Sequence, residues 1–113
     1  MSVKETIKSQ VEGHPVVLYM KGSPQFPQCG FSATATQLLK MSGAGEVFTV
    51  DVLQDPDIRE GIKQYANWPT IPQLYVKGEF VGGCDIIREM FQAGELQGLL
   101  KEKGLAVREG ASA

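Results

Sequence analysis

The chain has 113 residues, of which 42% are hydrophobic and 21% charged, and its formal net charge is -2. This is the composition of one folded globular domain rather than of a disordered or fibrous chain. Without a surplus of positive charge, nucleic-acid binding is not expected. No apolar run is long enough to cross a membrane, and no secretion signal opens the sequence.

A helix and a buried strand are predicted at the start of the chain. Ser2 and Glu5 have the spacing of a capping box, and apolar residues recur every four positions until Gly13 and Pro15 end the helix. The run VVLYM, residues 16–20, is rich in β-branched and aromatic residues and short enough to be a strand covered on both faces. It is expected at the centre of a sheet.

A second helix and a second strand complete a β-α-β unit. After a loop that prolines interrupt, the helix ends near Gly43, and four apolar residues line one of its sides: Phe31, Ala35, Leu38 and Leu39. The segment EVFTVDV then predicts the second strand.

The third helix begins with strong end signals. Asp55 is its expected N-cap and Pro56 its first residue. Gly61 lies inside the helix and costs it about 1 kcal/mol. The buried side is formed by Ile58, Ile62 and Tyr65.

A hairpin and two helices follow. PQLYVKGEFVGG predicts two short strands joined by a tight turn at Lys77 and Gly78. The helix DIIREMFQAG stops at Gly94, and a short last helix, ELQGLLKEKG, packs beside it. The domain is expected to span residues 1–104, followed by a loose, flexible tail over residues 105–113.

This order of elements predicts the fold class. One parallel crossover and one antiparallel pair share a sheet between helical layers. The class is therefore α/β, a thioredoxin-like fold with a four-stranded mixed sheet flanked by helices.

Cys29 is the first candidate for chemistry, because it ends a loop just before a helix. Unpaired N–H groups and the helix dipole favour a thiolate there, and Lys21 at the end of the first strand adds positive charge. The pKa of Cys29 is expected below about 8.5, the ordinary value. The alternative, a buried cysteine without a chemical role, suits the polar surroundings of Cys29 poorly.

The number and spacing of the cysteines indicate a compartment. Because Cys84 forms no Cys-x-x-Cys pair with Cys29, a reducing compartment, the cytoplasm, is expected.

The segment NWPTIPQ offers backbone groups for binding. Pro72 enters a strand, and the Ile71–Pro72 peptide bond is predicted to be cis. Ile71 would then present its N–H and C=O to an extended, peptide-like ligand. The alternative is that Pro72 is only a turn residue.

The segment GGCD offers groups for charged ends of a ligand. Gly82 and Gly83 let a backbone approach closely, and Cys84 and Asp85 open a helix whose N–H groups could hold a carboxylate. Asp85 could hold an ammonium group, or could be a plain N-cap.

Arg59 and Lys63, four positions apart, project from the same side of the third helix. They could hold a second carboxylate, or form a solvated basic stripe. Taken together, these residues describe a groove for a small peptide with two carboxylates and an amine, beside a thiolate. Glutathione has that formula.

The motifs KGSPQFPQCGFS and NWPTIPQLYVKGEFVGGCD, in this order and spacing, resemble those of monothiol glutaredoxins of the Cys-Gly-Phe-Ser class, bacterial single-domain type. The resemblance runs from about residue 3 to about residue 102 and agrees with a thioredoxin-like fold. Pro72 is the cis-proline by this resemblance. The implied glutathione contacts are Lys21, Arg59, Lys63, Ile71, Gly83, Cys84 and Asp85.

The resemblance also implies a carrier of a [2Fe-2S] cluster rather than an enzyme. Such a cluster usually needs four thiolates, and here Cys29 of each of two subunits and two glutathiones would supply them. A homodimer, a BolA-like partner and apo iron-sulfur acceptor proteins follow from it. With Ser32 in place of a second cysteine, a glutathione bound to Cys29 is not readily expelled. The GSPQFP loop is typical of the family and longer than in dithiol relatives.

Other functions stay open. The chain could be a glutathione-dependent oxidoreductase that removes glutathione from proteins with Cys29 as nucleophile. It could form an internal disulfide between Cys29 and Cys84, or act as an adaptor whose main role is binding another protein. The two cysteines and His14 do not make a recognisable ligand set for a zinc site.

Overall fold

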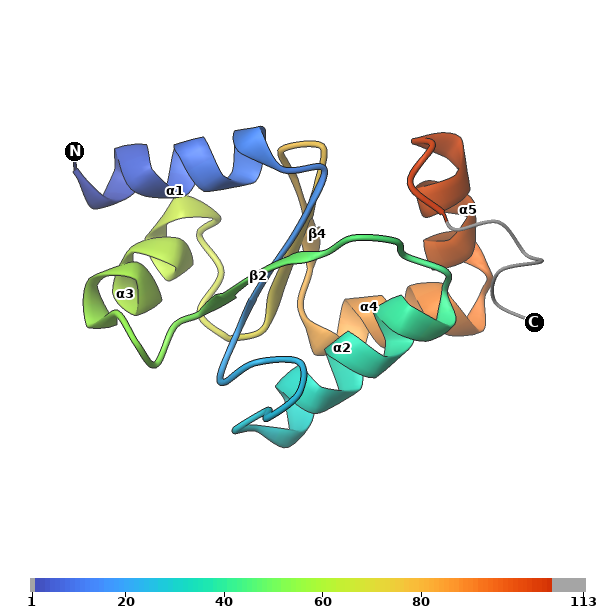
Figure 1. The fold of residues 1–113 in the computed structure, drawn as a ribbon, viewed down its shortest axis with the longest axis horizontal. Helices are drawn as coiled ribbons and strands as arrows, with labels where there is room; N and C mark the ends of the chain where they lie inside the picture. Colours follow the sequence, from blue (N-terminus) through green and yellow to red (C-terminus); the bar gives the residue numbers. More distant parts are fainter. Residues whose placement is uncertain (1, 107–113) are drawn as a thin grey trace.

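A four-stranded mixed sheet lies between helices in the computed structural model, which describes residues 2–106 (Figure 1). The strand order is β2-β1-β3-β4. β1 (Val16–Met20) runs parallel to β2 (Phe48–Asp51) and antiparallel to β3 (Gln73–Val76), which pairs antiparallel with β4 (Glu79–Gly82). The predicted fold class and the central place of VVLYM are confirmed.

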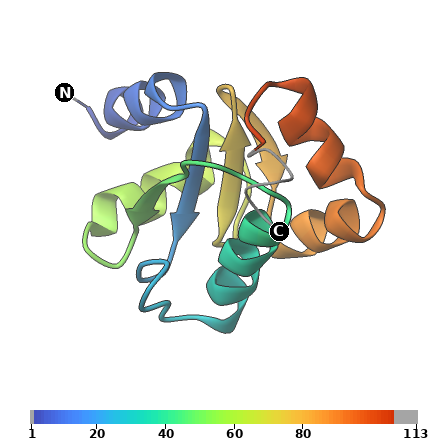
Figure 2. The same ribbon diagram turned by 45° about the vertical axis from the view of Figure 1, so that its right-hand side comes forward.

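Two helical layers cover the sheet (Figures 1 and 2). α1 (Val3–Gly13) and α3 (Pro56–Tyr65) pack together on one face. α2 (Gly30–Met41) and α4 (Cys84–Gln92) pack together on the other, and α5 (Glu95–Glu102) lies beside α4.

β1 is buried along its whole length because both of its faces are covered. Successive side chains of a strand point to opposite faces. Val16, Leu18 and Met20 therefore join the core formed with α2, α4 and α5. Val17 and Tyr19 join the core formed with α1 and α3. Full burial of each such aliphatic side chain contributes about 1.5–3 kcal/mol.

Gly61 has a packing role that explains its place inside a helix. α1 begins with the predicted capping box, in which the Glu5 N–H donates to Ser2 Oγ at 3.1 Å and the Ser2 N–H to Glu5 Oε1 at 3.0 Å. α1 contacts α3 at Gly61, where a Cβ would overlap the Val3 side chain and lie 3.2 Å from Ile7 Cδ1. The glycine thus lets the two helices approach closely, which offsets its low helix propensity.

One of the apolar residues grouped on α2 is not part of the core. Ala35 and Leu39 are buried and Leu38 packs against them, but Phe31 is 60% exposed. Phe31 lies in the first turn of α2, where its side chain lines the cavity described below instead of packing on the sheet.

Local end and turn signals are confirmed. Asp55 Oδ1 accepts the N–H of Asp57 at 3.0 Å and that of Ile58 at 3.2 Å, so Asp55 is the N-cap of α3. Lys77 and Gly78 have φ of 52° and 81°. Two successive positive φ angles suit a two-residue hairpin turn whose twist matches the strands.

The chain returns to the sheet after α5. The Gly45 N–H donates to the Leu105 carbonyl at 3.3 Å, and Ala106 forms an isolated bridge with Ala44. Leu105 and Ala106 are the first two residues of the predicted tail. The rest of that tail, residues 107–113, lies outside the described residues.

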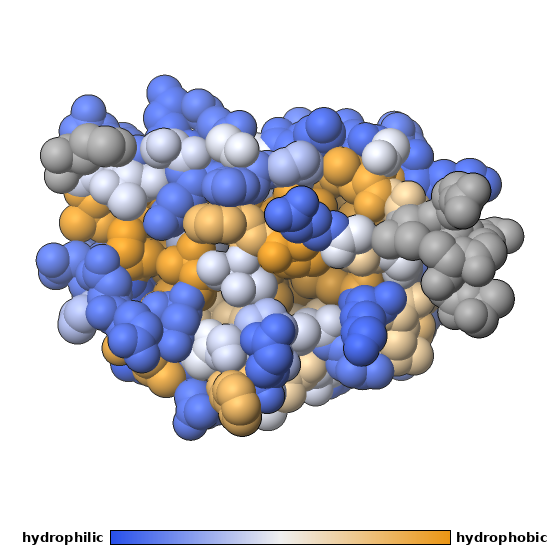
Figure 3. All heavy atoms as spheres, in the orientation of Figure 1, coloured by the Kyte–Doolittle hydropathy of each residue, from blue (hydrophilic) through white to orange (hydrophobic). Residues whose placement is uncertain are grey.

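The surface seen in Figure 3 carries hydrophobic side chains in a band between hydrophilic rims. β2, an edge strand whose residues are half-buried, crosses this face (Figure 1). Within residues 2–106, none of the helices combines the length and apolar character needed to cross a bilayer.

Candidate active site

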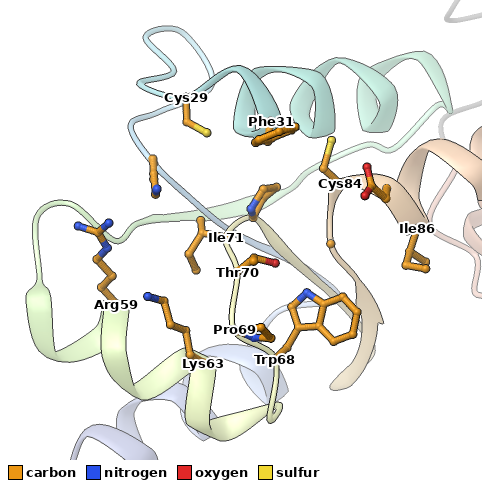
Figure 4. A pocket seen from close by; sticks show the side chains of 14 residues that line it. Cys29, Phe31, Arg59, Lys63, Trp68, Pro69, Thr70, Ile71, Cys84 and Ile86 are labelled. Carbon is orange, nitrogen blue, oxygen red and sulfur yellow. The ribbon is translucent and has the colours of Figure 1, made fainter.

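The nine residues singled out in the sequence all line one cavity of about 390 Å³. It lies at the edge of the sheet where β1, β2 and β4 end and β3 begins (Figure 4). These nine are Lys21, Cys29, Arg59, Lys63, Ile71, Pro72, Gly83, Cys84 and Asp85. Five further lining residues were missed, namely Phe31, Trp68, Pro69, Thr70 and Ile86. Three of the five belong to the segment NWPTIPQ, so that motif already contained the signal.

Cys29 is the N-cap of α2, and its half-buried side chain lines the cavity. Burial of the sulfur raises its pKa, but hydrogen bonds from the N–H groups of Ser32 and Phe31, the Lys21 ammonium and the Ser32 hydroxyl together outweigh that effect. The pKa of Cys29 is therefore lowered from its ordinary value, as predicted. The thiolate, which is the nucleophile and the metal ligand, is favoured.

Ser32 does more than replace a second thiol, because it also has a structural role. It is fully buried, and its Oγ accepts the Lys21 backbone N–H at 3.0 Å. This bond joins the end of β1 to the first turn of α2. A sulfur at this position would be a weaker acceptor, so the serine also holds the Cys29 site together.

Replacing Lys21 with alanine is expected to raise the pKa of Cys29 toward its ordinary value. The ammonium stabilises the thiolate, so its loss reduces the thiolate fraction at neutral pH. The alkylation rate of Cys29 measured against pH should shift to higher pH and fall at pH 7. Lys40→Ala, in the last turn of α2, is the matched control and should leave the profile in place. If Lys21→Ala and Lys40→Ala gave the same pH profile of alkylation, Lys21 would have no specific role in stabilising the Cys29 thiolate.

The loop between Lys21 and Cys29 is fixed by hydrogen bonds at both of its ends. The Gln28 N–H donates to the Lys21 carbonyl at 2.9 Å. The Gly22 N–H donates to Asp51 Oδ1, also at 2.9 Å. Asp51, at the end of β2, therefore ties the loop that carries the thiol to the sheet.

The Ile71–Pro72 peptide bond is cis, as predicted. Ile71 lies across the cavity from Cys29 (Figure 4). Within residues 2–106, neither the N–H nor the C=O of Ile71 has a hydrogen-bond partner. Both groups are therefore available to an extended ligand in the cavity.

α4 begins at the cavity with its N–H groups open. Gly83 is the N-cap, without a side-chain cap, so the interpretation of Asp85 as the N-cap is wrong. Asp85 lies in the first turn, with Oδ1 3.5 Å from Arg88 Nη1. A Cβ at Gly83 would lie 3.3 Å from the Pro72 carbonyl oxygen, which confirms the close backbone approach expected of GGCD, and 3.1 Å from Trp68 Nε1.

Charge is unevenly distributed around the cavity. Arg59 and Lys63 extend from α3 toward it (Figure 4), and Lys21 at the end of β1 adds a third cation. Asp85 lies on the α4 side. The cavity thus offers separate places for anionic groups and for one cationic group.

The two cysteines differ in reactivity. Both thiols are free. Cys84 is 7% exposed, and burial raises its pKa, with contributions in the same direction from Asp85 and Cys29 against the lowering effect of Arg88. Cys29 is therefore the reactive thiol, and a Cys29–Cys84 disulfide stays a prediction for oxidised protein.

The chain does not hold a complete ligand set for a metal in the part that the structure describes. No group of three or more histidine, cysteine, aspartate or glutamate residues gathers there. His14 stacks on Phe48, with ring centroids 3.8 Å apart, and does not line the cavity. A closed zinc site of the two cysteines and His14 is not formed.

Comparisons with known proteins agree with this geometry. The family model described as Glutaredoxin matches residues 16–81. The chain is 60% identical to Glutaredoxin 4 of Escherichia coli (strain K12) over 99 residues, which cover 87% of this chain and 84% of that protein. It is 56% identical to Glutaredoxin 4 of Haemophilus influenzae (strain 86-028NP) over 102 residues, which cover 90% and 94%.

Solved structures share the fold. A monomeric truncated mutant of Trypanosoma brucei 1-C-Grx1 matches with a TM-score of 0.84 and 38% identity, over 96% of this chain and 98% of that one. A buckwheat glutaredoxin-glutathione complex matches with a TM-score of 0.80 and 25% identity, over 93% of each chain. The chain therefore belongs to the glutaredoxin family, and the single thiol of its Cys-Gly-Phe-Ser site makes it one of the monothiol type.

Proposed function

We propose that the protein binds glutathione in this cavity and carries a [2Fe-2S] cluster, which two subunits hold through Cys29 and glutathione and pass to apo iron-sulfur proteins. The observation that carries the proposal is the setting of Cys29. It is a thiolate-forming side chain at the end of a cationic, peptide-sized cavity, in a chain without a complete ligand set among its described residues.

Glutathione suits the cavity in charge and in hydrogen bonding. Arg59, Lys63 and the open N–H groups of α4 match its two carboxylates, and Asp85 matches its ammonium group. The unpaired backbone groups of Ile71 match its peptide bonds. A glutaredoxin solved with glutathione is among the proteins of the same fold.

The number of thiolates explains why glutathione and a second subunit are needed. A [2Fe-2S] cluster usually has four thiolate ligands. Cys29 supplies one, while Cys84 is buried and its pKa is raised. The remaining ligands therefore come from outside the chain, and exchangeable glutathione lets the cluster leave without unfolding the protein.

A second candidate function uses the same sulfur. The lowered pKa of the accessible Cys29 also suits a nucleophile that removes glutathione from protein thiols. Ser32 opposes fast turnover, because a mixed disulfide has no neighbouring thiol to resolve it. The carrier is therefore the preferred function, with the oxidoreductase as the alternative.

We also propose partners and a compartment for the protein. The cluster joins a homodimer, and a BolA-like protein or an apo acceptor can replace the second subunit as the source of ligands. Free thiols at Cys29 and Cys84 suit the cytoplasm, where thiols are kept reduced.

Anaerobic reconstitution tests the carrier function. Wild-type protein mixed with iron, sulfide and glutathione is expected to give a brown dimer with about two iron, two sulfide and two glutathione per dimer. Cys29→Ser should stay colourless and monomeric, and Ser9→Ala, on the exposed side of α1, should behave as wild type. Iron binding that survives Cys29→Ser, or the omission of glutathione, would sink the proposal. Colourless wild-type protein with rapid turnover on a glutathione disulfide would establish the alternative.

A further inference from the structure

The side chain of Gln73 is fully buried and makes three hydrogen bonds. Its Nε2 donates to the Trp68 carbonyl at 3.0 Å and to the Thr70 carbonyl at 3.2 Å. Its Oε1 accepts the Tyr75 hydroxyl at 3.0 Å. The side chain of the first residue of β3 thus reaches back to the segment before it.

Tyr75 and the loop carbonyls together fix the orientation of this amide. The Tyr75 hydroxyl donates to Gln73 Oε1. Burial, and next the neighbouring Tyr65, raise the pKa of Tyr75 above its ordinary value, so the hydroxyl keeps its proton. The Trp68 and Thr70 carbonyls can only accept, so the amide nitrogen must face them, and the amide oxygen is left facing the Tyr75 hydroxyl.

The segment that Gln73 holds is the loop over residues 68–72. Five residues of this loop line the cavity: Trp68, Pro69, Thr70, Ile71 and Pro72. The Trp68 N–H donates to the Lys63 carbonyl at 2.9 Å. Beyond that bond, in the part of the chain that the structure describes, the Gln73 amide provides the hydrogen bonds of the loop. The two prolines have no N–H with which to make others.

We propose that Gln73, oriented by Tyr75, is a positioning residue that holds loop 68–72 so that the Ile71 backbone stays available to the peptide bonds of glutathione. The inference rests on the glutathione binding proposed above. Two loop carbonyls are occupied by Gln73, while the N–H and C=O of Ile71 are left without a partner among residues 2–106. Without the Gln73 hydrogen bonds, the loop would lose the fixed backbone conformation that Ile71 needs in order to pair with an extended ligand.

The contact with Ile71 should make Cys29 selective for disulfides that contain peptide bonds. This selectivity can be measured in thiol–disulfide exchange. The Cys29 thiolate attacks one sulfur of a small disulfide and forms a mixed disulfide with that half of the molecule, and the other half leaves as a thiolate. Glutathione disulfide contains peptide bonds that can pair with Ile71, whereas 2-hydroxyethyl disulfide contains none. Loss of the Gln73 tie should therefore slow the first reaction and spare the second.

Gln73→Met and Tyr75→Phe test the inference. Both remove hydrogen bonds while keeping most of the buried volume. The measured quantity is the ratio of the rate constants of Cys29 with glutathione disulfide and with 2-hydroxyethyl disulfide. The ratio is expected to fall about tenfold in Gln73→Met and by a smaller factor in Tyr75→Phe. If Gln73→Met does not fold, Tyr75→Phe decides the outcome alone.

Tyr19→Phe is the matched control. Tyr19 lies in the same core as Tyr75 and also donates its hydroxyl to a glutamine, Gln10 Oε1, at 2.7 Å, but that bond leads to α1 and not to the loop. It should leave the ratio unchanged. Equal ratios in all three variants and wild type, or an equal fall for Tyr19→Phe and Tyr75→Phe, would overturn the inference. A wild-type protein without any preference for glutathione disulfide would instead overturn the proposed glutathione binding.

Discussion

Gly22→Ala is expected to lower the free energy of unfolding by about 2 kcal/mol or more and to slow the reaction of Cys29 with glutathione disulfide. Gly22 has a φ of +88°, and a Cβ there would lie 2.5 Å from the Phe26 carbonyl oxygen and 2.7 Å from the Gln28 backbone nitrogen. Both neighbours are backbone atoms, so a side chain cannot move aside to make room. The loop must change shape, and Cys29 moves with it.

Thermal unfolding and thiol kinetics measure the two effects separately. Gly98→Ala is the control, because Gly98 lies inside α5 and an added Cβ meets nothing within 4 Å. It should raise stability by about 0.5–1 kcal/mol, as expected for glycine in a helix interior. The account of the loop fails if Gly22→Ala unfolds and reacts as the wild type does.

The elements that sequence predicted well are set by local chemistry. The capping box of Ser2 and Glu5 acts within one helical turn. The turn at Lys77 and Gly78 follows from the φ angles that a two-residue hairpin demands. Signals of this kind are complete within a few residues, so a single sequence is sufficient to find them.

The features that sequence reasoning missed depend on contacts between distant segments. The bond from Gly22 to Asp51 joins positions 29 apart, and nothing near Asp51 distinguishes it from an ordinary residue of a strand. Helical periodicity grouped Phe31 with the apolar side of α2 but could not tell that the first turn lies over a cavity. Likewise, the reason for a glycine at position 61 is visible only in the contact between α3 and Val3 of α1.

The strand directions explain why scattered candidates meet. β1, β2 and β4 end at the same edge of the sheet at which antiparallel β3 begins. Residues that follow β1 and β4, or precede β3, must therefore lie close together, as Lys21, Gly83 and Ile71 do. α2 and α4 also begin there, which brings the positive ends of two helix dipoles to one cavity. Sequence reasoning brought these residues to one edge of the sheet because the topology was predicted correctly.

The double variant Arg59→Ala/Lys63→Ala is expected to lower the rate constant of Cys29 with glutathione disulfide by about a hundredfold at low salt, since each charged contact contributes about tenfold. Both side chains are half-buried beside the cavity. Their attraction for a carboxylate is therefore screened less than that of fully exposed charges. The rate constant with the uncharged 2-hydroxyethyl disulfide should change little.

Salt provides the second measurement. The wild-type rate constant with glutathione disulfide should fall as ionic strength rises, and the double variant should show a weaker dependence. Lys40→Ala/Lys101→Ala removes the same charge from the exposed last turns of α2 and α5, so it controls for net charge. If this control slows the reaction as much as the double variant does, the effect comes from the overall field of the protein. In that case Arg59 and Lys63 are a solvated basic stripe and do not bind the carboxylates of the ligand.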